Sequence, residues 1–343
     1  MSFINLRNGR LIGDYLRPYI VAELNTSHFG DLTIARQMID QAKTAGCDCV
    51  KFQSWSADTL YCEGYYKENK IAKRMVTKFA LSNEQLKELA IYAKQIEIDF
   101  ASTPYSIEEA IFLVEQCSVP FLKIASMELN NPHYLDQLGR LGVPLVLSTG
   151  MGELEEIIAA VRTIASTGNN QLIILHCTSI YPANPDIIRL QNVLGLRSEF
   201  PSFPIGYSDH SIGTEIPSAS VALGACLIEK HFTLDNSRIG MDNQMATEPE
   251  EMQAMVKACH RVYEAMGGAG RILGEKEREQ ITKMRRSIVS RFRLQPGDIL
   301  TESAIEFKRP GTGIPPTQYL KVLDRKVATH IDAGMIINED DLL

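Results

Sequence analysis

Short apolar runs alternate with amphipathic stretches along most of the 343-residue chain. The runs are rich in Val, Ile and Phe and are too short to be helices, which predicts buried strands. The intervening stretches have helical spacing. The one at Leu32–Ala45 stops before Gly46, a favourable C-cap residue, and Ser82 and Ser106 are predicted N-caps. Eight runs carry the pattern: Tyr19–Leu24, Cys47–Gln53, Ile98–Thr103, Phe121–Ser126, Pro144–Thr149, Leu172–Thr178, Pro204–Ser208 and Cys226–Phe232.

Eight strands that alternate with helices predict an α/β fold, a (β/α)8 TIM barrel. The alternative is a doubly wound parallel sheet. Nucleotide-binding sheets of that kind carry a Gly-x-Gly-x-x-Gly turn after the first strand, and none follows Tyr19–Leu24. One gap between strands, at about 54–81, is long, polar and tyrosine-rich. We expect it to be a long loop close to the active site.

The alternation ends near Gly270. A highly charged stretch, 270–286, predicts a helical linker. From there to the C-terminus the apolar runs are shorter and are separated by Pro/Gly turns, which predicts a small β-rich domain. Its core is too small for much independent stability. We therefore expect a barrel domain over 1–269, the linker over 270–286 and a second domain over 287–343.

Charge and cysteine content exclude several classes of protein. The chain has 35 Lys+Arg against 42 Asp+Glu, a formal net charge of −7. This balance disfavours nucleic acid or an anionic membrane as the main partner. The first residues lack the apolar core of a signal sequence, and no apolar run approaches the roughly 18 residues of a membrane span. Seven scattered cysteines, an odd number, indicate a reduced chain. We expect a cytoplasmic protein.

The active site of a TIM barrel forms at the carboxyl ends of its strands, so polar residues at those ends are candidates. Every predicted strand supplies at least one. Strand alternation places Lys230 on the face opposite to that of His231. The candidates are Glu23; Lys51 and Gln53; Ser102 and Thr103; Lys123, Ser126 and Glu128; Ser148 and Thr149; Thr178, Ser179 and Tyr181; Ser208, Asp209 and His210; Glu229, Lys230 and His231.

Two of these candidates are lysines within apolar strands. A buried, unpaired ammonium is costly, so Lys51 and Lys123 predict an anionic ligand such as a phosphate or a carboxylate. The alternative is a lysine that extends its ammonium to solvent from an edge strand. A closed barrel has no edges, which favours the anion-binding interpretation.

Two histidines end neighbouring strands of the predicted barrel. Adjacent imidazoles at His210 and His231 predict a divalent metal site, and two hydrogen-bonded structural histidines are an equally good interpretation. With oxygen ligands and water, such a site would suit Mn²⁺, and Mg²⁺, Fe²⁺ or Zn²⁺ are alternatives. Glu23 and Glu128 are carboxylates in similar positions. They could act as general acids or bases, or form salt bridges with the strand lysines.

Nine segments form a recognisable combination when taken in order along the chain. They are VAELNTSHFGD (21–31), VKFQSW (50–55), FASTPYS (100–106), LKIASMELNN (122–131), VLSTGM (146–151), LHCTSIYPA (175–183), IGYSDHSIG (205–213), IEKHFTLD (228–235) and FKRPGTGIPP (307–316). Together they resemble the N-acetylneuraminate (sialic acid, or nonulosonate) synthase family, which includes pseudaminate, legionaminate and spore-coat-type synthases. The resemblance covers nearly the whole chain, and residues 287–343 resemble an antifreeze-like (SAF) domain.

The resemblance implies a metal-dependent transferase that condenses phosphoenolpyruvate with an N-acylated amino-hexose such as N-acetylmannosamine. With water, the products are a nine-carbon 3-deoxy-2-keto sugar acid and phosphate. It also implies a domain-swapped homodimer, in which Arg309 reaches the barrel of the other subunit. The matching motifs assign Lys51, Thr103, Lys123, Ser126, Ser148, Ser179 and Ser208 to phosphoenolpyruvate; Gln53, Tyr181, Asp242 and Arg309 to the sugar; His210 and His231 to Mn²⁺; and Glu23 and Glu128 to the reacting carbons.

Three departures from the family pattern fall where the sugar is expected. The usual Glu-Ile-Gly-x-Asn-His-Asn-Gly reads ELNTSHFG at 23–30, which puts Asn25 and Ser27 in place of Gly and Asn. The usual Lys-Ile-Gly-Ser-Gly-Glu contains Met127, and the usual Gly-Pro-Asp-His ends in Asn243. The motifs for phosphoenolpyruvate and metal are intact. The sequence therefore leaves the acceptor sugar open.

Other functions remain compatible with the same barrel. One is another synthase that condenses phosphoenolpyruvate with a sugar. A second is an aldolase that forms a Schiff base on Lys51 or Lys123 and needs neither metal nor phosphoenolpyruvate. A third is a non-catalytic carbohydrate-binding or scaffolding protein. The intact lysines, Glu128 and the two strand-end histidines argue against loss of the site.

Overall fold

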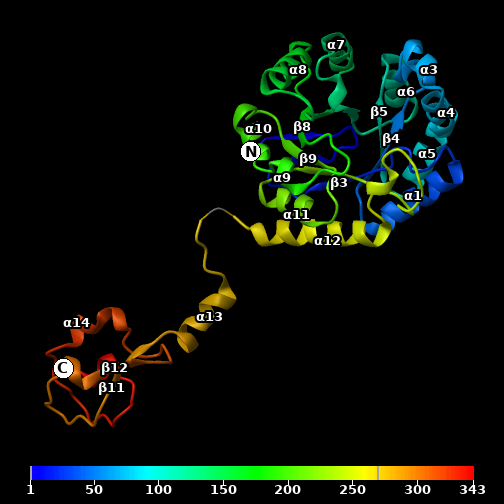
Figure 1. Ribbon diagram of the computed structural model, residues 1–343. Coiled ribbons are helices and arrows are strands. Elements are labelled where there is room, and N and C mark those ends of the chain that lie inside the picture. Colours follow the sequence, from blue (N-terminus) through cyan, green and yellow to red (C-terminus); the bar gives the residue numbers. More distant parts are fainter. Residues whose placement is uncertain (1, 269) are drawn as a thin grey trace. The chain divides into compact units, whose positions relative to one another are not determined.

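The computed structural model describes residues 2–268 and 270–343. Contacts divide the chain into two compact units, Met1–Gly267 and Gly268–Leu343. In the first unit, helices surround a central set of strands (Figure 1). Among the described residues, no helix combines the length and the apolar character needed to cross a bilayer.

Eight parallel strands close into a barrel, which confirms the predicted TIM-barrel fold. The last strand pairs with the first, so that Leu227 lies opposite Tyr19 and His231 lies opposite Glu23. Every predicted apolar run contributes one strand. The strands are β3 (Tyr19–Glu23), β4 (Cys49–Ser54), β5 (Asp99–Pro104), β6 (Leu122–Ile124), β7 (Leu145–Ser148), β8 (Leu172–Cys177), β9 (Ile205–Asp209) and β10 (Leu227–His231).

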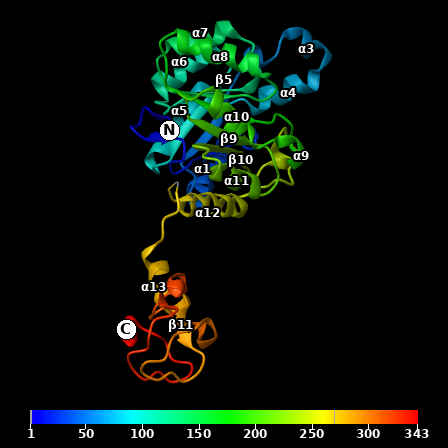
Figure 2. The same cartoon turned by 90° about the vertical axis from the view of Figure 1, so that its left-hand side faces the viewer.

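Helices connect the strands and cover the outside of the barrel. The first, α1 (Leu32–Ala45), has the predicted bounds and ends at Gly46, whose φ of 90° favours glycine. Ser82 and Ser106 form the predicted N-caps, each within a capping box. Two views at right angles show α7 beside α8 and α11 beside α12 (Figures 1 and 2). The other helices are α5 (Asn83–Gln95), α6 (Ile107–Gln116), α7 (Pro132–Arg140), α8 (Leu154–Ser166), α9 (Pro185–Ile188), α10 (Asn192–Glu199), α11 (Glu215–Ala222) and α12 (Pro249–Met266).

The long gap after β4 is helical, so the prediction of a loop at about 54–81 was wrong about its local structure. It forms α2 (Ala57–Leu60), α3 (Glu63–Glu68) and α4 (Lys70–Phe79). Phe79 at the end of α4 packs edge-to-face on Phe29, with ring centroids 5.8 Å apart. Such tertiary contacts stabilise short helices whose polar composition suggests a loop.

The amino-terminal end of the barrel is closed by a hairpin, β1 (Phe3–Asn5) and β2 (Leu11–Gly13), which pair antiparallel. Ile4 and Ile12 of this hairpin join an apolar cluster with inward-facing barrel residues such as Tyr19 and Phe121. This cluster fills the barrel interior at its amino-terminal end. Polar side chains of the barrel interior therefore gather at the opposite end.

The second unit begins with α13 (Glu275–Met284), which lies within the stretch predicted to be a linker. Within residues 270–343, β11 (Ser287–Ser290) and β12 (Ile305–Lys308) form one antiparallel pair, accompanied by isolated bridges and α14 (Tyr319–Val322). Its regular strand content is lower than the β-rich expectation suggests. The apolar core of the second unit includes Ile288, Leu300, Val322, Val327 and Ile337.

Short 3-10 helices occur in both units. They are Ser126–Glu128, Asn243–Met245, Glu302–Ala304, Pro316–Gln318 and Glu339–Asp341.

Candidate active site

A cavity of about 340 Å³ lies at the carboxyl ends of the barrel strands, within the range of about 300–1,000 Å³ common for ligand sites. All residues to which the family motifs assign a role, except Glu128 and Arg309, line it, whereas the strand-end candidates Ser102, Thr149, Thr178, Asp209 and Lys230 do not. The motif residues that line it are Glu23, Lys51, Gln53, Thr103, Lys123, Ser126, Ser148, Ser179, Tyr181, Ser208, His210, His231 and Asp242. The barrel thus brings together residues from strands that are far apart in the sequence.

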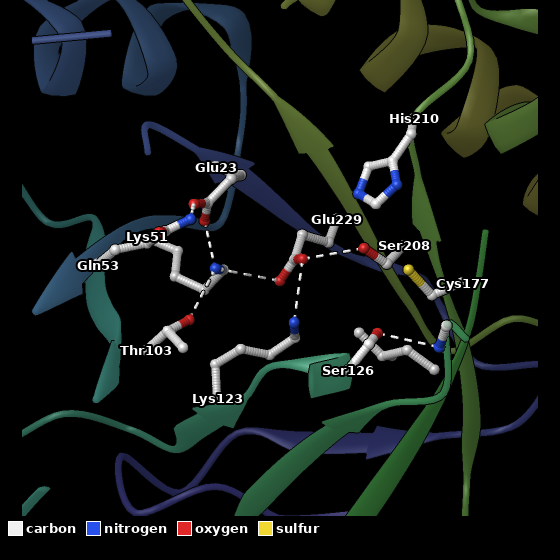
Figure 3. A network of polar contacts seen from close by, with 12 residues as sticks. Glu23, Lys51, Gln53, Thr103, Lys123, Ser126, Cys177, Ser208, His210 and Glu229 are labelled. Atoms are coloured by element: carbon white, nitrogen blue, oxygen red, sulfur yellow. Dashed lines mark hydrogen bonds and ion pairs between the residues drawn. The ribbon is translucent and has the colours of Figure 1, made fainter. Parts of the chain in front are cut away.

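A network of charges occupies the floor of the cavity (Figure 3). Lys51 forms an ion pair with Glu23, donates to the Thr103 hydroxyl at 3.1 Å, and lies 3.7 Å from the Glu229 carboxylate. The other oxygen of Glu229 lies 3.3 Å from the ammonium of Lys123. All four charged side chains are almost fully buried. Two ammonium groups and two carboxylates therefore balance one another in the absence of a ligand.

The environment shifts the protonation equilibria of these groups. Burial by itself raises the pKa of Glu229, but Lys123 and Lys51 outweigh it and lower that pKa to about 2. Burial disfavours the charged form of Lys51, yet Glu229 and Glu23 raise its pKa above the usual value. Glu23 differs, because burial raises its pKa in spite of the nearby Lys51. Glu229 and Lys51 are thus held charged, while Glu23 is the carboxyl that more readily takes up a proton.

Hydroxyl groups and one close glycine form the wall beside the lysines. The Gly150 amide donates to the Ser126 hydroxyl at 2.9 Å. A Cβ at Gly150 would lie 2.1 Å from the Ser179 hydroxyl, so only glycine fits between these serines. The buried Ser148 hydroxyl has no hydrogen-bond partner among the described residues. One unpaired hydroxyl among several others next to two ammonium groups suits the oxygens of an anion.

His210 and His231 meet at the edge of the cavity. Their ring centroids are 5.2 Å apart, and the Tyr181 ring lies 4.2 Å from that of His210. The Nδ1 of His210 contacts the Thr178 carbonyl oxygen at 2.7 Å. A carbonyl only accepts, so Nδ1 carries the proton and Nε2 keeps a free lone pair. Burial lowers the pKa of both histidines, which favours the neutral rings that metals bind.

These two histidines fit a divalent metal as neutral ligands, with a backbone carbonyl fixing one ring in the manner common at metal sites. In residues 2–268 and 270–343, no group of three or more His, Cys, Asp or Glu side chains is arranged to hold a metal. A metal at this site would therefore take its remaining ligands from water and substrate.

The predicted sugar-binding residues lie toward the mouth of the cavity. Gln53 links two of its walls, because its amide nitrogen donates to Glu23 at 2.9 Å and its carbonyl oxygen accepts from the Tyr105 hydroxyl at 3.0 Å. Tyr181 is 47% exposed at the rim. Asp242 accepts a hydrogen bond from Asn25. Leu60 and Tyr61, from the helical insertion after β4, also line the cavity.

Two predicted site residues lie elsewhere. Glu128 ends a 3-10 helix whose Ser126 and Met127 line the cavity, whereas Glu128 itself is 8% exposed and does not line it. Its carboxylate accepts a hydrogen bond from Asn131 at 2.9 Å. Arg309 belongs to the second unit, where its guanidinium lies 3.8 Å from the sulfur of Met284.

Sequence reasoning missed the central role of Glu229 in the charge network. It was a strand-end candidate without an assigned function, although strand alternation places it on the same face as His231. It also missed Tyr105, which directly follows β5 (Asp99–Pro104). Lys230 faces away from the cavity as alternation predicts, but it is buried against Asp209 at 2.5 Å.

A second cavity, of about 810 Å³, adjoins the first near Met151 and Cys177. Its lining mixes aliphatic residues such as Ile157, Ile188 and Leu196 with polar ones, and it includes neither Lys nor Arg. The smaller cavity holds the paired charges, the facing imidazoles and the unpaired hydroxyl. We therefore take the smaller cavity as the candidate active site.

A family model described as the NeuB family matches residues 38–271. The chain belongs to the NeuB family. A second model, for the SAF domain, matches residues 285–343, so the resemblance and the antifreeze-like domain predicted from the sequence are confirmed.

Relatives within the NeuB family are similar over nearly their whole length. The N,N'-diacetyllegionaminic acid synthase of Legionella pneumophila is 34% identical over 94% of both chains. Human N-acetylneuraminate-9-phosphate synthase is 31% identical over 98% of this chain and 96% of its own. The crystal structure of the N-acetylneuraminic acid synthetase of Leptospira borgpetersenii is 34% identical, covers 82% of this chain and 95% of its own, and superposes with a TM-score of 0.75. These relatives are thus named as synthases of legionaminic acid, N-acetylneuraminic acid or its 9-phosphate.

Proposed function

We propose that this chain catalyses the metal-dependent condensation of phosphoenolpyruvate, an N-acylated amino-hexose and water. The products are a nine-carbon 3-deoxy-2-keto sugar acid and phosphate. The main support is one cavity that combines two ammonium groups, several hydroxyls, two neighbouring neutral imidazoles and carboxylates. Relatives named as legionaminic, pseudaminic and N-acetylneuraminate-9-phosphate synthases support the same reaction class.

Phosphoenolpyruvate would bind on the floor of the cavity. Lys51 and Lys123 provide positive charge, and the hydroxyls of Thr103, Ser126, Ser148, Ser179 and Ser208 provide hydrogen bonds. Glu229 already neutralises part of this charge, with Ser208 donating to it at 3.0 Å. A trianionic ligand would therefore draw Lys51 and Lys123 partly away from Glu229 and Glu23.

His210 and His231 would hold the metal, for which we propose Mn²⁺. When bound, such a metal supplies Lewis-acid polarisation of the sugar aldehyde. The aldehyde carbon then accepts the new bond from C3 of phosphoenolpyruvate, and a water adds at C2. The tetrahedral intermediate releases phosphate with cleavage of the bond between C2 and the phosphate oxygen, and the C2 hydroxyl becomes the 2-keto group. Of the two protons that the added water brings, one ends on the former aldehyde oxygen and the other on the phosphate.

Two carboxyls would manage protons during these steps. Glu23 has a raised pKa and faces the cavity, so it can orient the substrate or exchange a proton with it. Glu128 would act at C2 after leaving its hydrogen bond to Asn131. Apo geometry of a general acid or base is often looser than that of the working complex.

The acceptor sugar would contact Gln53, Tyr181 and Asp242 at the mouth of the cavity. We further propose a domain-swapped homodimer in which Arg309 of one subunit completes the site of the other. Substrates of this class and seven free cysteines, six of them buried, agree with a cytoplasmic enzyme.

A Schiff-base mechanism is the less favoured alternative. Imine formation requires a neutral amine, and the two glutamates beside Lys51 raise its pKa. Lys51 is therefore better suited to bind an anion than to attack a carbonyl.

The test is phosphate release from phosphoenolpyruvate in the presence of Mn²⁺, with products identified by mass spectrometry. The acceptors are N-acetylmannosamine, mannose, 2,4-diacetamido-2,4,6-trideoxyhexoses and five-carbon sugar phosphates. We expect release with an N-acylated amino-hexose, loss of activity in EDTA and recovery on addition of Mn²⁺. Activity that persists in EDTA together with borohydride trapping of a lysine adduct would instead establish the aldolase. Calorimetry that detects neither Mn²⁺ nor phosphoenolpyruvate binding would favour the non-catalytic protein.

A further inference from the structure

Two loops meet at the acceptor end of the cavity. One follows β3 and contains Asn25, and the other, 235–243, precedes the 3-10 helix at Asn243–Met245. Both supply cavity-lining residues, Asn25 from the first and Met241 and Asp242 from the second. The departures from the family pattern at Asn25 and Asn243 therefore lie in two loops that face each other.

Asn25 occupies a backbone position suited to glycine. Its φ of 40° falls in the left-handed region, where glycine is least strained and asparagine is among the best tolerated of the other residues. The family pattern has glycine at this position. The chain thus keeps the backbone conformation and adds a side chain that is 5% exposed at the cavity wall.

The added side chain contacts the predicted sugar ligand Asp242. The Nδ2 of Asn25 donates a hydrogen bond to Oδ2 of Asp242. No other hydrogen bond to the Asp242 carboxylate is made by residues 2–268 and 270–343. One carboxylate oxygen is therefore used by Asn25, and Oδ1 is left to accept from a ligand. The bond also offsets part of the burial that raises the pKa of Asp242.

Hydrogen bonds of Asn243 and a contact of Arg238 with Phe29 hold the loop that carries Asp242. The buried Asn243 side chain accepts from the Thr233 hydroxyl at 2.6 Å and donates to the carbonyl oxygens of Asp235 and Arg238 at 2.8 Å. The Arg238 guanidinium lies 3.8 Å from the centre of the Phe29 ring. Asn243 thus serves as a structural brace of the loop, and Asp242 has little freedom to move away from Asn25.

We propose that Asn25 is a specificity-determining residue for the acceptor, an inference that rests on the proposed function. Its side chain fills space that glycine leaves open in the family pattern, and it fixes Asp242 so that one oxygen faces the acceptor. The site then favours a sugar that donates a hydrogen bond to Asp242 at this point and disfavours sugars with a larger substituent there.

The experiment compares Asn25→Gly and Asn25→Asp with the parent enzyme on N-acetylmannosamine and on 2,4-diacetamido-2,4,6-trideoxyhexoses. Glycine suits the backbone and removes both volume and hydrogen bond. Aspartate keeps the volume but places a second carboxylate beside Asp242. Asn8→Gly is the matched control, because Asn8 donates to the Asp99 carboxylate at 2.7 Å outside the cavity. Circular dichroism and calorimetry with Mn²⁺ and phosphoenolpyruvate check that each variant is folded and binds both.

We expect Asn25→Gly to raise the KM of the preferred acceptor about tenfold or more, as for loss of a hydrogen bond to a charged group. The preference among acceptors should shrink, while the KM of phosphoenolpyruvate stays unchanged. Asn25→Asp should also weaken acceptor use, and Asn8→Gly should alter neither. Acceptor KM and preference within twofold of the parent in both Asn25 variants would overturn the inference. A parent enzyme that releases no phosphate with any acceptor would overturn the proposed function, and the inference with it.

Discussion

The Glu229 carboxylate lies 3.3 Å from the Lys123 ammonium at the floor of the barrel and 3.7 Å from that of Lys51. One carboxylate thus compensates two buried cations. Removal of one partner of a buried ion pair leaves a charge without compensation and costs about 3–5 kcal/mol.

Glu229→Gln should therefore lower the free energy of unfolding of the ligand-free protein by about 3–5 kcal/mol. Phosphoenolpyruvate should raise the melting temperature of this variant more than that of the parent, because the ligand supplies the missing negative charge. Thermal denaturation with and without phosphoenolpyruvate measures both effects. Asp136→Asn, which breaks the exposed pair with Arg140, should change little. Equal stability of Glu229→Gln and parent would contradict the network.

Gly150→Ala should raise the KM of phosphoenolpyruvate at least tenfold. The new methyl group would lie 2.1 Å from the Ser179 hydroxyl and 2.9 Å from that of Ser126, so both hydroxyls would have to move. Steady-state kinetics measures the change. Gly195→Ala on α10 is the control, because its added methyl group meets nothing within 4 Å. A normal KM in Gly150→Ala would remove these serines from the phosphoenolpyruvate site.

Glu128→Gln should lower kcat at least a hundredfold, the usual scale for a lost general acid or base. Calorimetric binding of Mn²⁺ and phosphoenolpyruvate should persist, because Glu128 does not line the cavity. Asn131→Ala frees the carboxylate from its hydrogen bond and should leave kcat much closer to that of the parent. Near-normal kcat in Glu128→Gln would remove Glu128 from the mechanism.

His28 should make stability depend on pH. Burial lowers its pKa from 6.5 to about 4. Between these values the unfolded chain binds a proton that the folded chain does not, so stability falls as pH drops from 6.5 to 4. The full effect is about 3 kcal/mol. In His28→Asn the amide oxygen can still accept from the Gly30 amide, as Nδ1 does at 3.0 Å. Urea denaturation at several pH values in this range should show that the free energy of unfolding depends less steeply on pH in the variant than in the parent. An equally steep pH dependence in both proteins would refute the assignment.

Arg309→Ala should strongly reduce turnover of the acceptor sugar while leaving phosphoenolpyruvate binding largely intact. His231→Ala should abolish both Mn²⁺ binding and turnover. If the homodimer is domain-swapped, an equal mixture after subunit exchange contains hybrid dimers with one complete site. Such a mixture should recover about a quarter of the parent activity. A mixture as inactive as its components, in protein shown to exchange subunits, would rule out the swapped arrangement.

Much of the fold was predictable because its signals are local. The eight apolar runs and the caps at Gly46, Ser82 and Ser106 depend on residues close in sequence, and the structure contains them where expected. The helices at 57–79 were not predictable in this way. They depend on tertiary contacts such as that between Phe79 and Phe29.

The sequence by itself determined the barrel, the family and most of the residues around the cavity, because motifs at strand ends carry this information. Only the tertiary structure placed Glu229 between two lysines, Glu128 in a hydrogen bond with Asn131 and Asn25 against Asp242. These relationships depend on side-chain direction and on contacts between distant loops. A linear pattern of residue types does not encode such distances, because they emerge only when the barrel closes.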